Sequence, residues 1–64
     1  MKNRVKELRD KRKITQEELA ALIGISRQAI KEIEKEKFDP SLPTAFKMAK
    51  LFDLSIEKIF LFKE

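Results

Sequence analysis

Few residues of this chain could carry out covalent chemistry, whereas many could bind an anion. The sequence contains no Cys and no His, which excludes thiol nucleophiles and disulfides and removes the commonest metal ligand and general base. Its hydroxyl side chains therefore lack a His to activate them. A single Gly cannot build a glycine-rich phosphate loop. Fifteen Lys and Arg against eleven Asp and Glu give a net charge of +4. We therefore expect a binding protein rather than an enzyme, with no metal and no cofactor.

The positive charge is concentrated at the N-terminal end. Residues 1–13 carry seven basic side chains against two acidic ones, whereas residues 38–64 are balanced. Such a cluster is either a solvated helix face or a surface that neutralises phosphates and releases their counterions. Charge alone leaves both interpretations open.

The spacing of apolar and capping residues predicts an all-α domain of five short helices and no strands. The helices are expected over about residues 3–12, 16–23, 27–35, 42–52 and 56–60. Thr15 and Glu18 have the spacing of a capping box, and Gly24 stands where the second helix must stop. The expected N-caps of the last three helices are Ser26, Ser41 and Ser55. Nothing indicates a linker or a repeat, so residues 4–60 are expected to form one compact domain.

Residues 16–35 have the spacing of two helices that cross at a tight turn. Ala20 allows close approach of the two helices, and Gly24 can adopt the left-handed conformation of the turn. Ile30 and Ile33 lie three residues apart and face the crossing. A helix-turn-helix needs this combination for a crossing at about 90–120° over three or four residues. We therefore predict a helix-turn-helix motif over residues 16–35.

Five short segments make the sequence similar to a known family. The segments are Thr15–Ala20 (TQEELA), Gly24–Gln28 (GISRQ), Ile33-Glu34, Phe38–Leu42 (FDPSL) and Leu54–Phe60 (LSIEKIF). Together they resemble the Cro/repressor-type helix-turn-helix family, also called the XRE family, over roughly residues 4–60. The resemblance implies a compact five-helix, repressor-like fold that binds double-stranded DNA, usually as a homodimer on an inverted repeat. Such proteins are typically transcriptional repressors.

If the third helix is the recognition helix, its outward side chains enter the major groove. Arg27 can then bond to guanine O6 and N7, while Gln28 suits adenine N6 and N7. Arg27 at a helix N-terminus opposes the helix dipole at a cost of about 0.3–1 kcal/mol, which a guanine edge or a phosphate would offset. Glu32 would face phosphate unfavourably unless it accepts a hydrogen bond from a cytosine amine, so it is left out of the predicted contacts.

The remaining predicted DNA contacts each have a plainer alternative. The resemblance implies a phosphate contact for Gln16, which is otherwise an ordinary first-turn residue. Ser26 is first an N-cap, and Lys31 is either solvated or in contact with a base or phosphate. Lys35 and Lys37 flank the end of the third helix and are expected at phosphates. The complete predicted set is Gln16, Ser26, Arg27, Gln28, Lys31, Lys35 and Lys37.

Two positions depart from the family pattern. Ala29 stands where many relatives carry Thr or Ser, so a hydroxyl contact is replaced by a methyl group that could touch thymine. Lys35-Glu36 stands where Asn-Gly is usual. Without Gly, the helix must either continue or hold a residue with a side chain in the left-handed conformation.

The C-terminal run Ile59-Phe60-Leu61-Phe62 is too apolar for a free end. We expect residues 61–64 to form a short extended tail that contacts a second copy of the chain. The alternative is that Phe62 folds back over the core of its own chain.

The leading functional hypothesis is a sequence-specific regulator of transcription, expected to be a repressor. The alternative is a protein-interaction module, such as an antitoxin-like partner, using Leu22 and the apolar tail. No apolar run reaches the roughly 20 residues that a bilayer requires, and the N-terminus lacks the apolar stretch of a signal peptide. We expect the protein to be cytoplasmic and to bind no membrane. No small-molecule ligand is evident.

Overall fold

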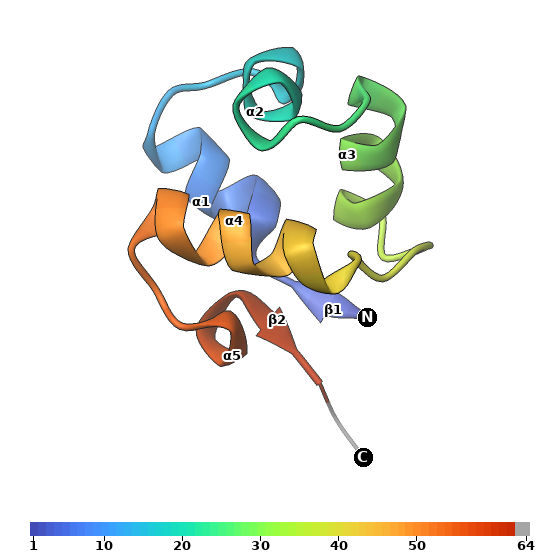
Figure 1. Cartoon of the computed structure of the whole chain (residues 1–64), viewed down its shortest axis with the longest axis vertical. Coiled ribbons are helices and arrows are strands. Elements are labelled where there is room, and N and C mark those ends of the chain that lie inside the picture. Colours follow the sequence, from blue (N-terminus) through green and yellow to red (C-terminus); the bar gives the residue numbers. More distant parts are fainter. Residues whose placement is uncertain (63–64) are drawn as a thin grey trace.

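The two ends of the helical domain meet in a small antiparallel sheet. The computed structural model describes residues 1–62. The elements in chain order are β1 (Lys2–Asn3), α1 (Val5–Lys11), α2 (Gln16–Ile23), α3 (Arg27–Glu34), α4 (Leu42–Phe52), α5 (Ile56–Ile59) and β2 (Phe60–Leu61) (Figure 1). The prediction of five helices is confirmed. The prediction that the chain has no strands is wrong.

The strands arise because the last helix ends one residue earlier than predicted. Phe60 has extended backbone angles, φ −108° and ψ 114°, and pairs with Asn3, while Leu61 pairs with Lys2. The Arg4 backbone N–H extends this pairing by donating to the Ile59 carbonyl oxygen at 2.9 Å. Leu61 therefore belongs to the fold rather than to a free tail. Residues 63 and 64 of the predicted tail lie outside the described residues.

The predicted caps explain where most helices begin. At α2, the Thr15 hydroxyl accepts from the Glu18 backbone N–H at 3.0 Å, and the Glu18 carboxylate accepts from the Thr15 N–H at 2.8 Å. The hydroxyl groups of Ser26 and Ser41 accept from the third residues of α3 and α4. Ser55 occupies the N-cap position of α5, as predicted, but forms no side-chain capping bond.

Positive φ angles mark the ends of several helices. Gly24 has φ +86° between α2 and α3, as predicted for the turn. Glu36, after α3, has φ +64°, and Asp53, after α4, has φ +54°. Lys13, after α1, also has a positive φ, +56°. Residues with a side chain adopt this conformation at a cost, so the structure accepts backbone strain at three helix ends that lack glycine.

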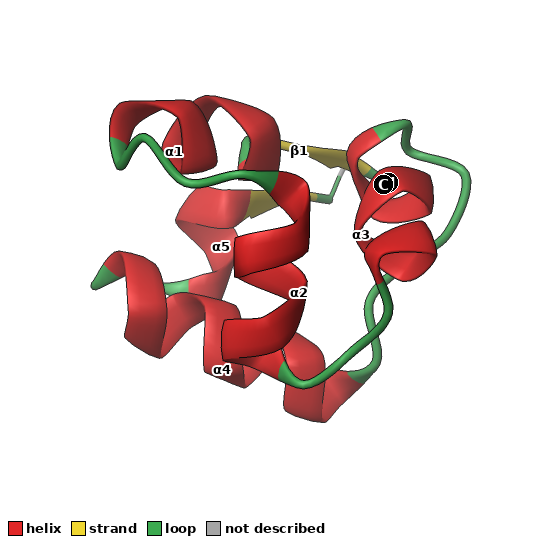
Figure 2. Cartoon of the chain, turned by 90° about the horizontal axis from the view of Figure 1, so that it is seen from above, coloured by secondary structure: helices red, strands yellow, loops and turns green. Residues whose placement is uncertain are grey.

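Each helix contributes one side chain to the centre of the core. The largest fully buried side chains are those of Val5, Leu19, Ile30, Met48 and Ile59, one from each of α1 to α5. Seen from above in Figure 2, α3 lies to one side of α2 and is joined to it by a short loop. In Figure 1, α2 and α3 lie at the opposite end of the molecule from α5 and β2. The core thus holds α3 in place while leaving its other side uncovered.

Candidate nucleic-acid interface

Helix α3 has a buried face and a polar face. Ile30 and Ile33 are buried in the core, whereas Arg27 and Gln28 are exposed and Lys31 is half-buried. The Ser26 hydroxyl accepts from the Ala29 backbone N–H at 3.0 Å, which fixes the start of the helix. The polar face that the sequence predicted is therefore presented to solvent on a rigid element.

A hollow at the start of α2 and α3 brings together two predicted contacts that are distant in sequence. It has a volume of about 400 Å³ and is lined by Arg9, Thr15, Gln16, Glu17 and Arg27. Gln16 begins α2 and Arg27 begins α3. Both helices therefore present their N-terminal ends to this hollow, where backbone N–H groups favour an anion. The negative charge of Glu17 beside them weakens this preference for an anion.

A largely buried ion pair connects α1 to α3 beneath the hollow. Arg9 Nε donates to Glu34 Oε2 at 2.8 Å, and a second Arg9 nitrogen donates to Glu34 Oε1 at 3.3 Å. Arg9 also donates to the Ile14 carbonyl oxygen at 2.9 Å. Hydrogen bonding to Glu34 raises the pKa of the Arg9 guanidinium, against the opposing effect of burial. Sequence reasoning assigned Arg9 only to the basic N-terminal cluster and did not identify this pair.

The same carboxylate holds Gln16. The Gln16 side-chain nitrogen donates to Glu34 Oε1 at 3.0 Å. A primary amide has two N–H donors, so one donor remains available for another acceptor. Gln16 is thus fixed at the edge of the hollow by a contact that the sequence analysis did not foresee. The signal for this contact in the sequence was that Glu34 directly follows the buried Ile33, at the edge of the core face of α3.

Gln28 also has a partner on its own helix. Its side-chain nitrogen donates to Glu32 Oε1 at 2.6 Å, one turn further along α3. Glu32 is half-buried and Gln28 is exposed. The spacing of four residues could have predicted this pair.

The end of α3 explains the position of the last two predicted contacts. Lys35 ends the helix, and Glu36 adopts the left-handed conformation with φ +64°. The sequence left two alternatives for this helix end without glycine, a longer helix or a residue with a side chain in the left-handed conformation. The structure shows the left-handed residue. Lys35 and Lys37 are both exposed on either side of this turn.

The N-terminal arginines are occupied within the molecule. Arg4 pairs with Glu7 at 2.8 Å, and Arg9 pairs with Glu34. The Arg12 guanidinium carbon lies 5.9 Å from the centre of the Phe52 ring. Arg4 and Arg9 are therefore engaged in ion pairs within the fold, whereas the exposed Arg12 keeps its positive charge. Of the lysines, Lys11 also approaches Glu7, at 3.5 Å.

Within residues 1–62, no group of three or more acidic side chains is placed to hold a metal ion. Among the same residues, no helix is long and apolar enough to cross a membrane.

A two-helix crossing with a solvent-facing second helix defines the class of the molecule as a helix-turn-helix DNA-binding protein. Comparison with known proteins agrees, because the helix-turn-helix family model matches residues 5–59. The chain belongs to this family of DNA-binding transcriptional regulators, of the XRE type.

The relatives are regulators of transcription rather than enzymes. An uncharacterized HTH-type transcriptional regulator of Methanocaldococcus jannaschii is 52% identical over 64 residues, covering 100% of this chain and 97% of the relative. The uncharacterized HTH-type transcriptional regulator YgzD of Bacillus subtilis is 42% identical, covering 100% of this chain and 97% of the relative.

A solved structure has a similar fold. The crystal structure of the restriction-modification controller protein C.AhdI from Aeromonas hydrophila matches with a TM-score of 0.78 and 32% identity. The match covers 89% of this chain and 86% of that protein.

Proposed function

We propose that this protein represses transcription by binding an inverted-repeat operator as a homodimer, with α3 of each copy in the major groove. The observation that carries the proposal is the division of α3 into a buried face and a polar face. Ile30 and Ile33 anchor the helix in the core, so Arg27, Gln28 and Lys31 are fixed at the surface together. A repressor of this kind acts by occupying the promoter.

The proposed contacts fall into two kinds, with different effects on specificity. Arg27 and Gln28, at the start of α3, read base edges as forked hydrogen-bonding groups. Lys31 contacts a base or a phosphate. The remaining side chains, Gln16, Ser26, Lys35 and Lys37, contact phosphates and fix the register of the protein on the duplex.

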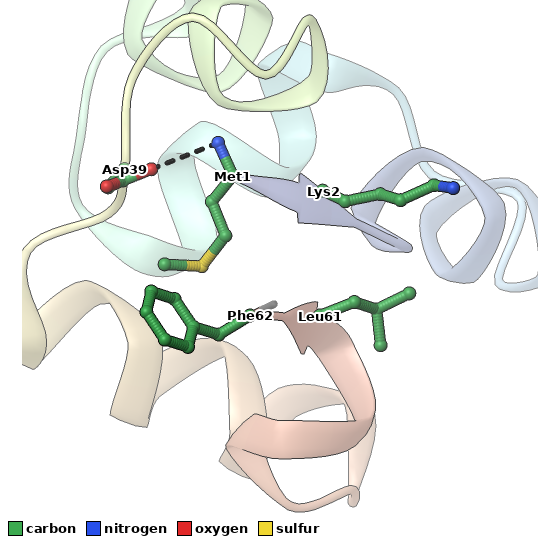
Figure 3. A pocket seen from close by; sticks show the side chains of 5 residues that line it. All are labelled: Met1, Lys2, Asp39, Leu61 and Phe62. Atoms are coloured by element: carbon green, nitrogen blue, oxygen red, sulfur yellow. Dashed lines mark ion pairs between the residues drawn. The ribbon is translucent and has the colours of Figure 1, made fainter. Parts of the chain in front are cut away.

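The homodimer is proposed at the end of the molecule that carries the sheet. A groove of about 300 Å³ is lined there by Met1, Lys2, Asp39, Leu61 and Phe62 (Figure 3). The Phe62 side chain is 72% exposed, so the alternative that it folds back over its own core is wrong. The groove combines apolar side chains with both signs of charge. A two-fold interface must be self-complementary. Asp39 pairs with the Met1 amino group of its own chain at 3.1 Å but stays 64% exposed, so Lys2 of the other copy can still approach it.

Selection of bound duplexes from a random library at physiological salt tests the proposal. We expect recovery of an inverted repeat whose half-sites are one helical turn apart, about 34 Å. Recovery of a single unrepeated half-site would contradict the homodimer. Recovery of no motif would contradict sequence-specific regulation altogether.

One observation favours a protein-interaction module as a second candidate. Leu22 is 61% exposed on α2 and has no role in the proposed DNA contacts. The two functions differ in their response to salt. DNA affinity should fall steeply with salt because phosphate contacts release counterions, whereas an apolar contact through Leu22 should not.

A further inference from the structure

The polar face of α3 contains one feature that phosphate binding does not explain. Glu32 lies on the side of the helix away from Ile30 and Ile33, among Gln28 and the lysines at positions 31 and 35. A carboxylate in this position repels the DNA backbone. If α3 lies in the major groove, a carboxylate on this face favours a partner that donates a hydrogen bond.

The hydrogen bond between Gln28 and Glu32 fixes what each side chain can offer. The Gln28 nitrogen donates to Glu32 Oε1 at 2.6 Å, which uses one of the two amide N–H donors. The second donor and the amide carbonyl remain free, and these two groups match adenine N7 and N6. The bond thus orients the amide without removing its capacity to bind adenine.

Glu32 keeps its own capacity to accept. An ionised carboxylate donates no hydrogen bond and has about four acceptor positions on its two oxygens, of which the Gln28 bond occupies one. Acceptors suit the cytosine N4 amine and are mismatched to guanine O6 and thymine O4, which are themselves acceptors. Adenine also has an amine, N6, but its neighbouring N7 is an acceptor and repels a carboxylate. Residues four apart on a helix have Cβ atoms about 5–6 Å apart, close enough to address neighbouring base pairs stacked about 3.4 Å apart.

We propose that Gln28 and Glu32 act as one hydrogen-bonded pair that reads two neighbouring base pairs, with Gln28 on adenine and Glu32 on cytosine. The inference rests on the proposed function, since it requires α3 to lie in the major groove. It adds Glu32 as a specificity-determining residue and explains why a negative charge is placed there. In this arrangement Glu32 lowers affinity for DNA in general and raises discrimination at one position.

The test compares the sequences selected from a random duplex library by the wild-type protein, Glu32→Gln and the matched control Glu36→Gln. Glu36 lies just beyond α3 and is exposed, whereas Glu32 is half-buried, so both variants remove one negative charge near this end of the helix. The control is expected to bind all duplexes somewhat more tightly, with an unchanged base profile. Glu32→Gln is expected to lose roughly tenfold of its preference for cytosine at one position, because the new amide can also donate to guanine or thymine.

A double-mutant cycle tests whether the two residues act as a pair. Gln28→Ala should weaken selection at the adenine and at the neighbouring cytosine, because Glu32 loses its orienting partner. The losses at the cytosine from Gln28→Ala and Glu32→Gln should therefore be smaller in the double variant than their sum. Additive losses would overturn the pairing.

The remaining outcomes separate this inference from the proposed function. If the wild type selects a motif and Glu32→Gln behaves like Glu36→Gln, Glu32 only stabilises the helix and the inference is overturned alone. If the wild type selects no motif, the proposed function fails and the inference fails with it.

Circular dichroism of each variant checks the fold. Should Glu32→Gln fail to fold, Glu32→Asp keeps the charge but shortens the reach, and it must also lose the cytosine preference.

Discussion

Arg9 and Glu34 form a two-fold hydrogen-bonded ion pair that joins α1 to the end of α3. The Arg9 Nε and Glu34 Oε2 atoms are 2.8 Å apart, and the two side chains are only 11% and 5% exposed. Gln16 donates to the same carboxylate at 3.0 Å. One buried carboxylate therefore connects the first helix, the start of α2 and the end of α3, so the position of α3 depends on it.

Removal of this carboxylate is expected to unfold much of the protein. Glu34→Gln removes the close counter-charge of the largely buried Arg9 guanidinium and leaves only the longer contact with the exposed Asp10 at 3.5 Å, which costs up to about 3–5 kcal/mol. A single core of this size rarely supplies more than about 3–5 kcal/mol, so the variant should be largely unfolded at 25 °C. Urea denaturation followed by circular dichroism measures the loss. Glu7→Gln, which breaks the exposed pair with Arg4, is the control and should change stability far less; equal losses would contradict a special role for the buried pair.

The exposed Arg4–Glu7 pair should make stability depend on pH on the acid side. Hydrogen bonding from Arg4, aided by the charges of Arg4 and Lys11, lowers the pKa of Glu7 from its ordinary value of 4.5. Because the folded-state pKa lies below the unfolded one, the contribution is complete above pH 4.5 and is lost as the pH falls through the folded-state pKa.

Thermal unfolding midpoints of the wild type and Glu7→Gln, measured across this pH range at low salt, test that prediction. The difference between the two proteins should shrink as the pH falls, and added salt should reduce it because both side chains are at the surface. A difference that stays constant with pH would show that Glu7 does not titrate as an ion-paired group.

Local signals in the sequence predicted the helices but could not predict the sheet. The capping box at Thr15, the Ser26 cap and the positive φ of Gly24 are each determined within a few residues, so α2 and α3 were placed correctly. Strands β1 and β2 have two residues each, which is too short for an alternating pattern. They form only because Lys2–Asn3 meets Phe60–Leu61 in the folded chain.

In the candidate site, too, the sequence predicted the features that depend on neighbouring residues and missed those that depend on packing. The outward face of α3 follows from Ile30 and Ile33, three residues apart, because the opposite side of the helix must face solvent. The bond between Glu34 and Arg9 joins residues 25 positions apart. No local pattern fixes such a contact, since it depends on how α1 and α3 are packed.

The turn after α3 should be stabilised by a glycine. Glu36 adopts φ +64°, and a residue with a side chain pays roughly 1–2 kcal/mol for the left-handed conformation. Glu36→Gly removes that cost, partly offset by the greater freedom of glycine in the unfolded chain, so a net gain of up to about 1 kcal/mol is expected. Glu36→Ala also removes the charge but keeps the strain. Urea denaturation should therefore rank the glycine variant above the alanine variant, and the opposite order would contradict strain at this turn.

Arg27 and Lys37 should affect DNA binding in different ways. Arg27→Ala should relax the preference at one base position and cost about 1–3 kcal/mol, because a base-edge contact is lost. Lys37→Ala removes a phosphate contact, so it should weaken binding to all sequences alike and reduce the slope of affinity against salt by about one. Selected sequences and salt titrations of both variants test this. Indistinguishable base profiles would show that the two residues do not divide the contacts as proposed.

The exposed Phe62 should control self-association. Its ring lies beside the Met1 side chain at the mouth of the groove (Figure 3) and is 72% exposed, so Phe62→Ala removes apolar surface without disturbing the Lys2–Leu61 strand pairing. Sedimentation of this variant should shift toward monomer, and affinity for a two-half-site operator should fall more than affinity for a single half-site. Leu22→Ala is the matched control, since Leu22 is 61% exposed on α2, at the other end of the molecule from β2 (Figure 1). It should leave sedimentation unchanged, and if it alone dissociated the protein, the dimer would form through α2 instead.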